Sequence, residues 1–496
     1  MVAPLGLAAH PCESCHPKEV AGYSRSSMAH SLRPAGKEPE GWFAAGGTKF
    51  TIHADGQGLW QGMERDGEVT RYRASYVIGS GSHASGYLIQ IGDHLFQSPI
   101  CYYPNRRSYD LAPGYEKLAD PDFTRPVTEA CLLCHSGAPR HVAGSVNRYR
   151  SPPFAEEAIS CERCHGPSQA HLERPVPGSI VNPAKLAGAA RDSVCEQCHL
   201  AGAVRVLNPG KSFDDFRAGQ RLEEVFTIYT AAAPAGGLKV ISHSEQLARS
   251  ACARGSAGRM WCGTCHNPHN KPAQAAAYYR ARCLSCHEGK LARSHPASTT
   301  DCVGCHMPRR QARDGGHSVF TDHRIARRPQ PDQDSPADGE LAAWRNPEPA
   351  LAERNLAMAY VNAGIERRSP PWIVRGYRML TEVQKAAPDD IDVLNGLGTA
   401  LLLGKQPAEA LRAFQRVLEL APDNPASEQN VAMAWMESGQ PDQAVPHLER
   451  CLELDPLQLE AAMTLMGVYR QKGDTAKESA VRERIRAELG AGRGRQ

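Results

Sequence analysis

The spacing of hydrophobic residues changes along the chain. In residues 392–424 and 427–458, apolar side chains return every three or four positions, as on one face of an α-helix. The two stretches align with an offset of 34 residues, so that small, large and proline positions coincide. This pattern predicts repeated helix pairs, with Cys451 buried as an apolar packing residue. The coincident positions are Ala410 and Ala444, Phe414 and Leu448, Val417 and Cys451, and Pro422 and Pro456.

A period of 34 residues with these positions is typical of tetratricopeptide repeats, in which each helix pair packs on the next. An earlier copy runs from about Leu351 to Pro388, with an insertion after Gly364. A degenerate later copy runs from Leu459 to about Arg486. We therefore predict an all-α solenoid of three to four helix pairs over residues 343–490, with a concave face that binds a protein partner or another copy of the chain.

Before residue 130 the hydrophobic pattern is that of β-strands. Residues 74–103 alternate strand-forming residues with glycine-rich turns, and Gly92-Asp93 separates two such runs as a hairpin turn does. We predict a small β-rich insertion over about residues 42–118. Residues from 131 to about 330 are rich in proline and glycine, which favours short helices and little regular structure.

A polar stretch at residues 327–342 fits neither pattern and is interpreted as a linker. It separates residues 1–326 from the repeat domain. No run approaches the roughly 18 apolar residues that a membrane helix needs. The 57 basic and 54 acidic residues give a formal charge of +3. We therefore expect neither a membrane span nor a nucleic-acid partner.

Cysteine is the informative residue type. Fourteen of the 17 cysteines form seven CxxC pairs, and a histidine follows each pair. Histidine makes up only 20 of 496 residues, so chance does not explain this coincidence. The paired cysteines are Cys12, Cys15, Cys131, Cys134, Cys161, Cys164, Cys195, Cys198, Cys262, Cys265, Cys283, Cys286, Cys302 and Cys305. The histidines that follow are His16, His135, His165, His199, His266, His287 and His306.

Haem c attachment accounts for all three residues of the CxxCH motif together. The two thiols add to porphyrin vinyl groups, and the adjacent imidazole becomes the proximal iron ligand. Zinc explains paired cysteines but not a histidine at the next position, and a thioredoxin-like redox pair would occur once. Seven porphyrins would also replace side chains in the interior, which explains an aromatic content of only 6%.

We therefore predict a haem-packed multihaem cytochrome c fold over residues 1–326, with seven haems c. Because haem c is attached outside the cytoplasm, we expect a periplasmic or extracellular protein. The first residues, MVAPLGLAAHPC, lack a charged region and a full apolar region. We interpret GLAA as the end of a truncated export signal. The sequence leaves open whether Cys101 and Cys252 form a disulfide.

Thirteen histidines lie outside the motifs, and their use as distal ligands decides how many irons are closed to substrates. His269 follows His266 by three residues, too close to reach the opposite face of the same iron, so we expect it to bind an adjacent one. His171 stands six residues after His165 in the same way. The alternative for each is a solvated surface histidine. Further distal candidates are His83, His243, His295, His317 and His323, and weaker ones are His53, His30 and Met28.

The sequence resembles exported multihaem c-type cytochromes with doubled CxxCH motifs and a tetratricopeptide domain. Its haem part is similar to the class of the nitrifier tetrahaem cytochrome c and hydroxylamine oxidoreductase. The resemblance is carried by segments such as YVIGSGSHASGYL, AISCERCHGPSQAH, GRMWCGTCHNPHNK and HSVFTDHRI. It implies distal ligation by His83, His171, His243, His269, His295, His317 and His323.

Two departures bear on function. No CxxCK motif occurs, which disfavours a pentahaem nitrite reductase, and seven motifs disfavour an eight-haem hydroxylamine oxidoreductase. The favoured hypothesis is electron transfer through a haem chain to redox protein partners. One alternative is an oxidoreductase that acts on a nitrogen or sulfur oxyanion at one open haem, with a pocket that residues 17–130 build over the first haem. Another alternative is a subunit of a conductive assembly.

Overall fold

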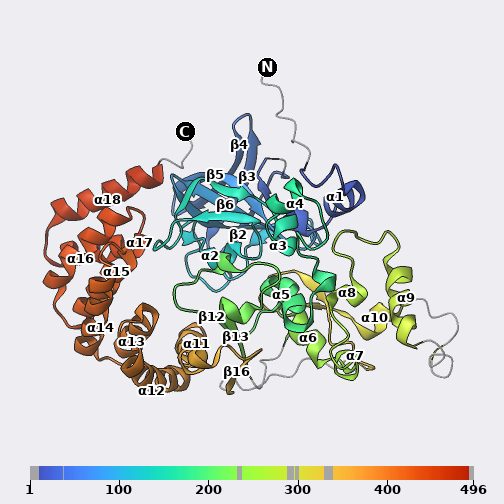
Figure 1. Cartoon of the computed structure of the whole chain (residues 1–496). Coiled ribbons are helices and arrows are strands. Elements are labelled where there is room, and N and C mark those ends of the chain that lie inside the picture. Colours follow the sequence, from blue (N-terminus) through green and yellow to red (C-terminus); the bar gives the residue numbers. More distant parts are fainter. Residues whose placement is uncertain are drawn as a thin grey trace.

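The computed structural model describes residues 10–36, 38–231, 237–287, 295, 301–328 and 339–490. The expected export signal and most of the expected linker lie outside these ranges. Figure 1 shows three regions: a sheet near the N-terminus, an arc of helices at the C-terminus, and the motif-bearing segments beside both. Among the described residues, none of the helices has the length and apolar character needed to cross a membrane.

The N-terminal region is an antiparallel sheet that nearly closes on itself. Strands β2 to β8 follow one another in order, and β8 lies against β2. The phenol of Tyr109 on β8 donates to the carbonyl of Pro39, just before β2, at 2.6 Å. The strands are β1 (Leu32–Pro34), β2 (Gly41–Ala45), β3 (Thr48–Asp55), β4 (Gly58–Arg65), β5 (Glu68–Ile78), β6 (Ser85–Ile91), β7 (His94–Tyr103), β8 (Ser108–Leu111) and β9 (Arg125–Pro126).

The sheet has a conventional core of its own side chains. Buried and exposed residues alternate along β3, where Phe50 and Ile52 point inward. These residues pack with Leu59, Tyr87 and Phe96 from other strands. The sequence predicted a small insertion within a haem-packed fold. The predicted β structure is confirmed, but the region is larger than expected and is not packed around haem: it is a nine-stranded near-barrel filled by its own side chains.

Short, separate elements carry the CxxCH motifs, as the sequence predicted. Four of them, α3, α8, α9 and α10, bury none of their residues. The helices are α1 (Pro17–Tyr23), α2 (Glu129–Leu132), α3 (Cys161–His165), α4 (Gln169–Glu173), α5 (Gly188–His199), α6 (His243–Arg249), α7 (Ala251–Gly255), α8 (Cys262–Cys265), α9 (Ala275–His287) and α10 (Cys302–His306).

Three small antiparallel sheets connect these helices. The 3-10 turns between them are η1 (Met28–His30), η2 (Pro183–Lys185), η3 (Phe213–Asp215) and η4 (Leu222–Glu224). The first sheet pairs β10 (Ala138–His141) with β11 (Tyr149–Glu156), and the second pairs β14 (Arg309–Gln311) with β15 (Val319–Thr321). The third joins β12 (Val204–Leu207), β13 (Phe226–Ala231) and β16 (Leu341–Ala343). Since β16 begins within the last two residues of the expected linker, the segment that leads into the repeat domain is built into a sheet of the motif region.

The C-terminal region consists of four helix pairs, which confirms the predicted solenoid (Figure 1). The aligned residues Ala410, Phe414, Ala444 and Leu448 are all at most 1% exposed, and so is Cys451, as predicted. After η6 (Pro349–Leu351), the helices are α11 (Ala352–Arg367), α12 (Pro370–Ala386), α13 (Ile391–Leu403), α14 (Pro407–Leu420), α15 (Pro425–Glu437), α16 (Pro441–Leu454), α17 (Leu459–Gln471) and α18 (Thr475–Gly490).

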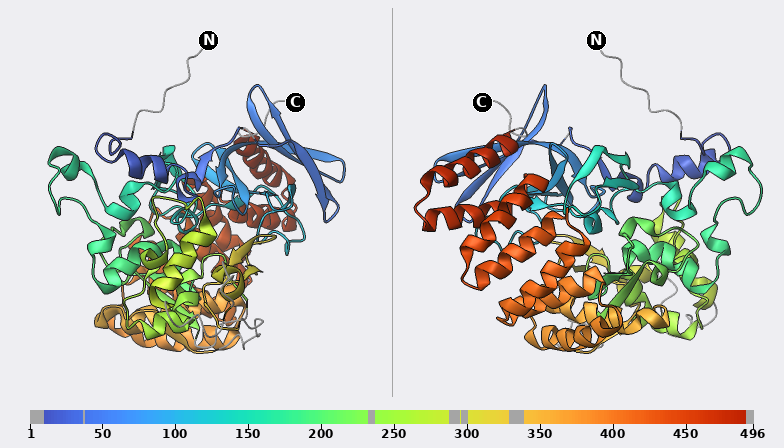
Figure 2. Two further views of the ribbon diagram at one scale, coloured as in Figure 1. Left: turned by 90° about the vertical axis from the view of Figure 1, so that its right-hand side faces the viewer. Right: turned by 60° about the vertical axis from the view of Figure 1, so that its left-hand side comes forward.

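Both ends of the solenoid are fixed to the rest of the protein, and Figure 2 shows the arc reaching from the sheet to the motif region. At the N-terminal end, α11 packs against β12, β13 and β16. At the C-terminal end, Leu457 joins the core of the large sheet. Beside it, the buried carboxylate of Asp455 lies 2.6 Å from Nε2 of His94 on β7. The solenoid therefore connects the motif region to the large sheet through its two ends.

Candidate haem centres

Most of the CxxCH motifs lie on a helical turn. Cys161 and His165 begin and end α3, and Cys302 and His306 begin and end α10. A spacing of three residues in a helix puts both thiols on one side, with the histidine one turn from the first thiol. This arrangement matches a porphyrin bound by two thioethers, with its iron above the imidazole.

A pair of imidazoles that binds one iron from opposite sides has a defined separation. A metal–nitrogen distance of about 2.0 Å and about 1 Å from nitrogen to ring centre place the two ring centres about 6 Å apart. Proximal and distal candidates can therefore be tested by the distance between their rings.

The first and third motifs meet this criterion with His171 and His269, the two candidates that closely follow a motif histidine in the sequence. The ring centres of His16 and His171 are 6.4 Å apart with an interplanar angle of 22°. Those of His165 and His269 are 5.7 Å apart at 19°. Within residues 165–171, His165 therefore faces His269 and His171 faces His16. His269 follows the fifth motif in the sequence but lies against the third.

Two further pairs have similar separations. The rings of His266 and His323 are 6.1 Å apart, and those of His306 and His295 are 5.8 Å apart. In both pairs, the motif histidine faces a candidate from outside the motif. His323 is held in place because its backbone N–H donates to Oε1 of Gln246 on α6 at 2.7 Å.

The fourth motif faces His243, but at a closer and steeper angle. The ring centres of His199 and His243 are 5.2 Å apart at 82°. His243 also lies 4.8 Å from His323. Four imidazoles, those of His199, His243, His266 and His323, therefore gather between the fourth and fifth motifs.

The remaining motif histidines, His135 and His287, have no imidazole partner in ring contact within the described ranges. Of the remaining candidates, His83 stacks on Phe320 at 4.3 Å. His317 lies with Nε2 2.8 Å from a carboxylate oxygen of Asp110. The structure thus brings five of the seven proposed distal histidines to motif histidines.

The weaker candidates lie elsewhere. His53 projects from β3, is 64% exposed and lies 3.1 Å from Glu40. Met28 and His30 lie in η1, whereas the ring that faces His16 is that of His171. Neither Cys101 nor Cys252 forms a disulfide, since both are free cysteines.

Hydrogen bonds set the tautomer of several imidazoles. Nδ1 of His165 lies 2.8 Å from the carbonyl of Val181, and Nδ1 of His306 lies 2.9 Å from that of Ala326. Nδ1 of His323 lies 2.9 Å from the carbonyl of Thr321. A carbonyl only accepts, so each Nδ1 carries the proton and Nε2 keeps the lone pair that binds a metal. Sequence reasoning missed these carbonyls because a backbone acceptor has no residue signature.

Burial also keeps the imidazoles neutral, which is the form that binds iron. Desolvation lowers the pKa of His199 to about 4, with a smaller contribution from His323 and His266. Desolvation and the neighbouring imidazoles lower the pKa of His243 to about 2. Burial likewise lowers the pKa of several other histidines, namely His83, His135, His266, His269 and His323.

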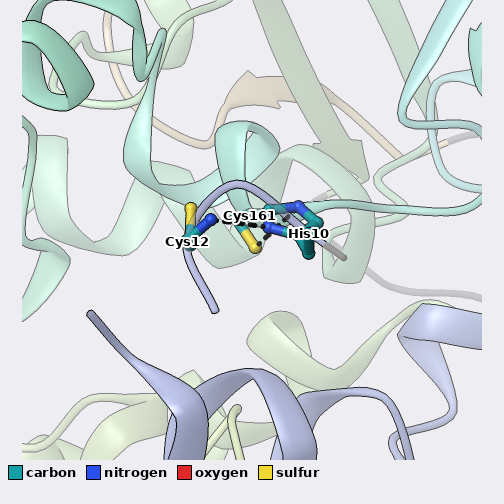
Figure 3. Close-up of side chains that lie close together, drawn as sticks. All are labelled: His10, Cys12 and Cys161. Atoms are coloured by element: carbon teal, nitrogen blue, oxygen red, sulfur yellow. Dashed lines mark hydrogen bonds between the residues drawn. The ribbon is translucent and has the colours of Figure 1, made fainter. Parts of the chain in front are cut away.

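The thiols of different motifs lie close together. Figure 3 shows Cys12 of the first motif, Cys161 of the third and His10 close together, with His10 in contact with both cysteines. Nε2 of His10 lies 3.6 Å from Sγ of Cys161, and one ligand atom of each residue lies within 4.8 Å of the others. This triad has the donor types of a zinc site. Both cysteines belong to CxxCH motifs, however, and thioether formation would use the same sulfurs.

Thiols of three other pairs of motifs lie close enough to shift each other's pKa. They join the second motif to the fourth, the fourth to the fifth, and the sixth to the seventh. The pairs are Cys134 with Cys198, Cys195 with Cys262, and Cys283 with Cys302. Because the two thiols of each pair belong to different CxxCH motifs, these contacts place neighbouring motifs side by side.

A buried ion pair missed from the sequence lies inside the fourth motif. Glu196, between Cys195 and Cys198, is 5% exposed. Its carboxylate lies 2.5 Å from the Arg345 guanidinium and accepts from Nε1 of Trp344 at 3.1 Å. Burial raises the pKa of Glu196, and Arg345 opposes this shift. Trp344 and Arg345 directly follow β16, so the start of the repeat domain contacts this motif.

Family models match three segments of the chain. A model described as cytochrome c554 and c-prime matches residues 113–166, and a doubled CXXCH motif model matches residues 255–292. A tetratricopeptide repeat model matches residues 391–424. No curated protein matches the chain.

Solved structures of MamA are also similar to part of the chain. The MSR-1 C2 structure is 21% identical, covers 28% of this chain and 77% of its own, and has a TM-score of 0.25. The RS-1 ArsTM double mutant is 17% identical, covers 29% and 76%, and has a TM-score of 0.26.

The motif models and the cytochrome model together support covalently bound haem c and haem-based electron transfer. The repeat model supports a protein-binding domain on the same chain. The chain therefore has the features of a multihaem c-type cytochrome with tetratricopeptide repeats.

Proposed function

We propose that this chain is a periplasmic or extracellular electron-transfer protein that carries seven haems c. The histidine of each CxxCH motif is the proximal ligand. His171, His269, His243, His323 and His295 are the distal ligands of the irons bound by His16, His165, His199, His266 and His306. His83 and His317 remain proposed distal ligands without an assigned iron.

One observation carries this proposal: the ring centres of four motif histidines lie 5.7–6.4 Å from a second imidazole. An iron with two imidazole ligands has no open position for a substrate, so such a centre transfers electrons without binding a reactant. The bound haem supplies the redox chemistry. The chain's residues fix the imidazole tautomers, exclude water and hold neighbouring sites close together.

The contacts between motifs suggest a branched route with the fifth motif at its centre. His269 connects the fifth motif to the third, whose Cys161 lies near Cys12 of the first. Cys262 connects the fifth motif to the fourth, and Cys198 of the fourth connects to the second. A third connection leads from the fifth motif to the sixth. The hydroxyl of Tyr279, on the helix that ends in the sixth motif, lies 3.2 Å from Nδ1 of His266.

Low-temperature EPR of the oxidised protein tests the proposed ligands. We expect His269→Ala to convert one haem from low spin to high spin, because the iron bound by His165 loses its sixth ligand. His447→Ala is the matched control, since His447 lies in the repeats and its Nδ1 contacts Glu428 at 2.7 Å. An unchanged EPR spectrum of His269→Ala would refute the assignment.

The repeat domain is proposed to bind a protein partner or a second copy of the chain. Because the solenoid is anchored at both ends, a partner bound to it would sit at a fixed distance from the haem centres. Electrons would leave through exposed haem edges, and the repeats would hold the redox partner there.

A second function is favoured by a cavity of about 770 Å³ beside the second motif. The sequence predicts the open haem at the first motif, but the ring of His171 faces His16 there. His135 of the second motif faces no imidazole within the described residues, and its buried Nδ1 has no hydrogen-bond partner there. The basic side chains of Arg140, Arg150 and Lys211 line the cavity, together with the carboxylates of Glu129, Asp214 and Asp215.

This alternative is an oxidoreductase acting on a small nitrogen or sulfur oxyanion at that haem. Adding nitrite to the oxidised protein distinguishes the two functions. A high-spin EPR signal that nitrite converts to low spin, and that Arg140→Gln weakens, supports the oxidoreductase. Spectra that are low-spin throughout and unaffected by nitrite would support electron transfer as the only function.

A further inference from the structure

A tyrosine of α9 packs against the histidine of the fifth motif. The hydroxyl of Tyr279 lies 3.2 Å from Nδ1 of His266, and the two ring centres are 5.5 Å apart at 66°. Tyr279 belongs to the helix that carries the sixth motif, so a side chain from one motif helix contacts the proximal histidine of another motif. The Nδ1 atoms of His165 and His306 lie against backbone carbonyls instead.

The helix presents Tyr279 on the same side as thiols of the sixth motif. Cys283 follows Tyr279 by four residues and Cys286 follows it by seven, which is the spacing of residues on one helix face. Helix α9 also lies against α8, the helix of the fifth motif. The contact between Tyr279 and His266 therefore follows from the position of the whole helix between the two motifs.

Neighbouring side chains support the position of Tyr279. The ring of Tyr278 packs edge-on against it, with the ring centres 5.2 Å apart at 86°. The guanidinium of Arg282 lies 4.9 Å from the centre of the Tyr278 ring and donates to the Tyr278 hydroxyl at 3.2 Å. The two adjacent tyrosines thus have different partners: the hydroxyl of Tyr279 contacts an imidazole, and that of Tyr278 contacts a guanidinium.

The direction of the hydrogen bond follows from the role of His266. An imidazole that binds iron through Nε2 carries its proton on Nδ1. Nδ1 of His266 then donates to the oxygen of Tyr279, since a phenol oxygen accepts as well as donates. An acceptor at Nδ1 makes the imidazole a stronger electron donor to the metal, which favours oxidised iron over reduced iron.

We propose that Tyr279 is a positioning residue for the fifth haem: its hydroxyl accepts the Nδ1 proton of His266, fixes the plane of that imidazole and lowers the reduction potential of the iron. The inference rests on the proposed function, because it requires a haem at Cys262 and Cys265. The fifth motif is the centre of the proposed route, so this potential would decide how electrons divide among its branches.

The test uses the haem-loaded full chain and its Tyr279→Phe variant, which keeps the ring and removes the hydroxyl. In spectroscopic redox titrations, we expect the reduced-to-oxidised ratio of one haem to rise about threefold to tenfold at a fixed potential, a shift of about 30–60 mV. Low-temperature EPR should show changed g values for one low-spin haem, because the imidazole plane is no longer fixed. The signal that His323→Ala converts to high spin identifies the fifth haem.

Tyr278→Phe is the matched control, because it removes a hydroxyl from the same helix that contacts Arg282. Its potentials and EPR spectrum should equal those of the wild-type protein.

Three results would overturn the inference. The first is a Tyr279→Phe protein with haem at Cys262 and Cys265 whose potentials and EPR spectrum equal those of the wild type. The second is an equal change in both tyrosine variants, because altered packing of α9 would then account for it. The third is a wild-type peptide map with no haem at Cys262 and Cys265, which would contradict the proposed function as well.

Discussion

Two helices of equal length show how differently the two halves of this molecule are held together. Helices α9 and α13 each have 13 residues. In the repeats, α13 buries seven residues, among them Val393, Leu394 and Leu397. In the motif region, α9 buries none. The side chains of the repeats form a core, whereas those of α9 do not.

This difference indicates that the two regions draw their stability from different sources. Each repeat packs on its neighbours, as in any solenoid. The motif helices present thiols and imidazoles instead of a continuous apolar face, and a bound porphyrin would supply the apolar surface that they lack. The large sheet resembles the repeats in this respect, since Phe50, Leu59 and Tyr87 fill its interior.

The largest effect is expected from producing the chain without haem attachment. The motif region should then lose its stable structure, because its short helices bury too little apolar surface to fold alone. Limited proteolysis followed by mass spectrometry should find cleavage concentrated in residues 161–328 and protection of residues 343–490. Equal protection of both regions would show that side chains alone stabilise the motif region.

A substitution that leaves a cavity in the core of the repeats should destabilise the protein without changing its haem spectrum. Phe414 is 1% exposed in the repeat core, so Phe414→Ala should lower the free energy of unfolding by about 3–5 kcal/mol. Its visible spectrum should be unchanged, because Phe414 lies in a core cluster made only of repeat residues. Chemical denaturation followed by circular dichroism measures the first quantity. A shifted haem spectrum would mean that the two regions are more tightly coupled than proposed.

The contact between the repeats and the sheet can be weakened with a single substitution. Asp455 is fully buried and lies 2.6 Å from Nε2 of His94, so Asp455→Asn should cost about 1–3 kcal/mol. Differential scanning calorimetry should show the repeats unfolding at a lower temperature. Asp423→Asn is the control, since Asp423 is 79% exposed in its contact with Arg450. Equal effects of the two substitutions would contradict the bracing role of the solenoid.

The smallest effect concerns a carboxyl group near the second motif. Burial raises the pKa of Asp214 from 3.8 to about 6. The folded state therefore holds this proton more tightly than the unfolded state. The stability it contributes is complete below about pH 4 and is lost as the pH rises through 6.

Asp214→Asn should accordingly stabilise the protein at pH 7 and have little effect at pH 4. The shift sets an upper limit of about 3 kcal/mol, which the 29% exposure of the side chain reduces to about 1 kcal/mol. Thermal unfolding of both proteins at the two pH values measures this difference. A larger benefit at pH 4 than at pH 7 would reverse the expected sign.

The sequence predicted the parts of the molecule that depend on nearby residues. The repeats follow from a period of 34 residues, and the CxxCH motifs are contiguous. The turn at Gly92-Asp93 is also local, and it is confirmed because Ile91 pairs with His94. Each of these signals lies within one element or between two adjacent ones.

Features that join distant residues were not predicted. The rings of His16 and His171 meet across 155 positions, and the sequence could nominate His171 as a ligand but not find its partner. The extent of the sheet was underestimated because β1 pairs with β5, far along the chain. The burial of Glu196 has no signal in the sequence, because Arg345, which pairs with it, lies 149 positions away.

The most direct test of the central claim is the number of covalently bound haems in the mature protein. Intact-mass spectrometry under denaturing conditions gives the total, and peptide mapping assigns each haem to a motif. The proposal predicts seven haems per chain, one on each CxxCH motif. A protein with fewer haems and free thiols at intact motifs, or with zinc at His10, Cys12 and Cys161, would contradict it.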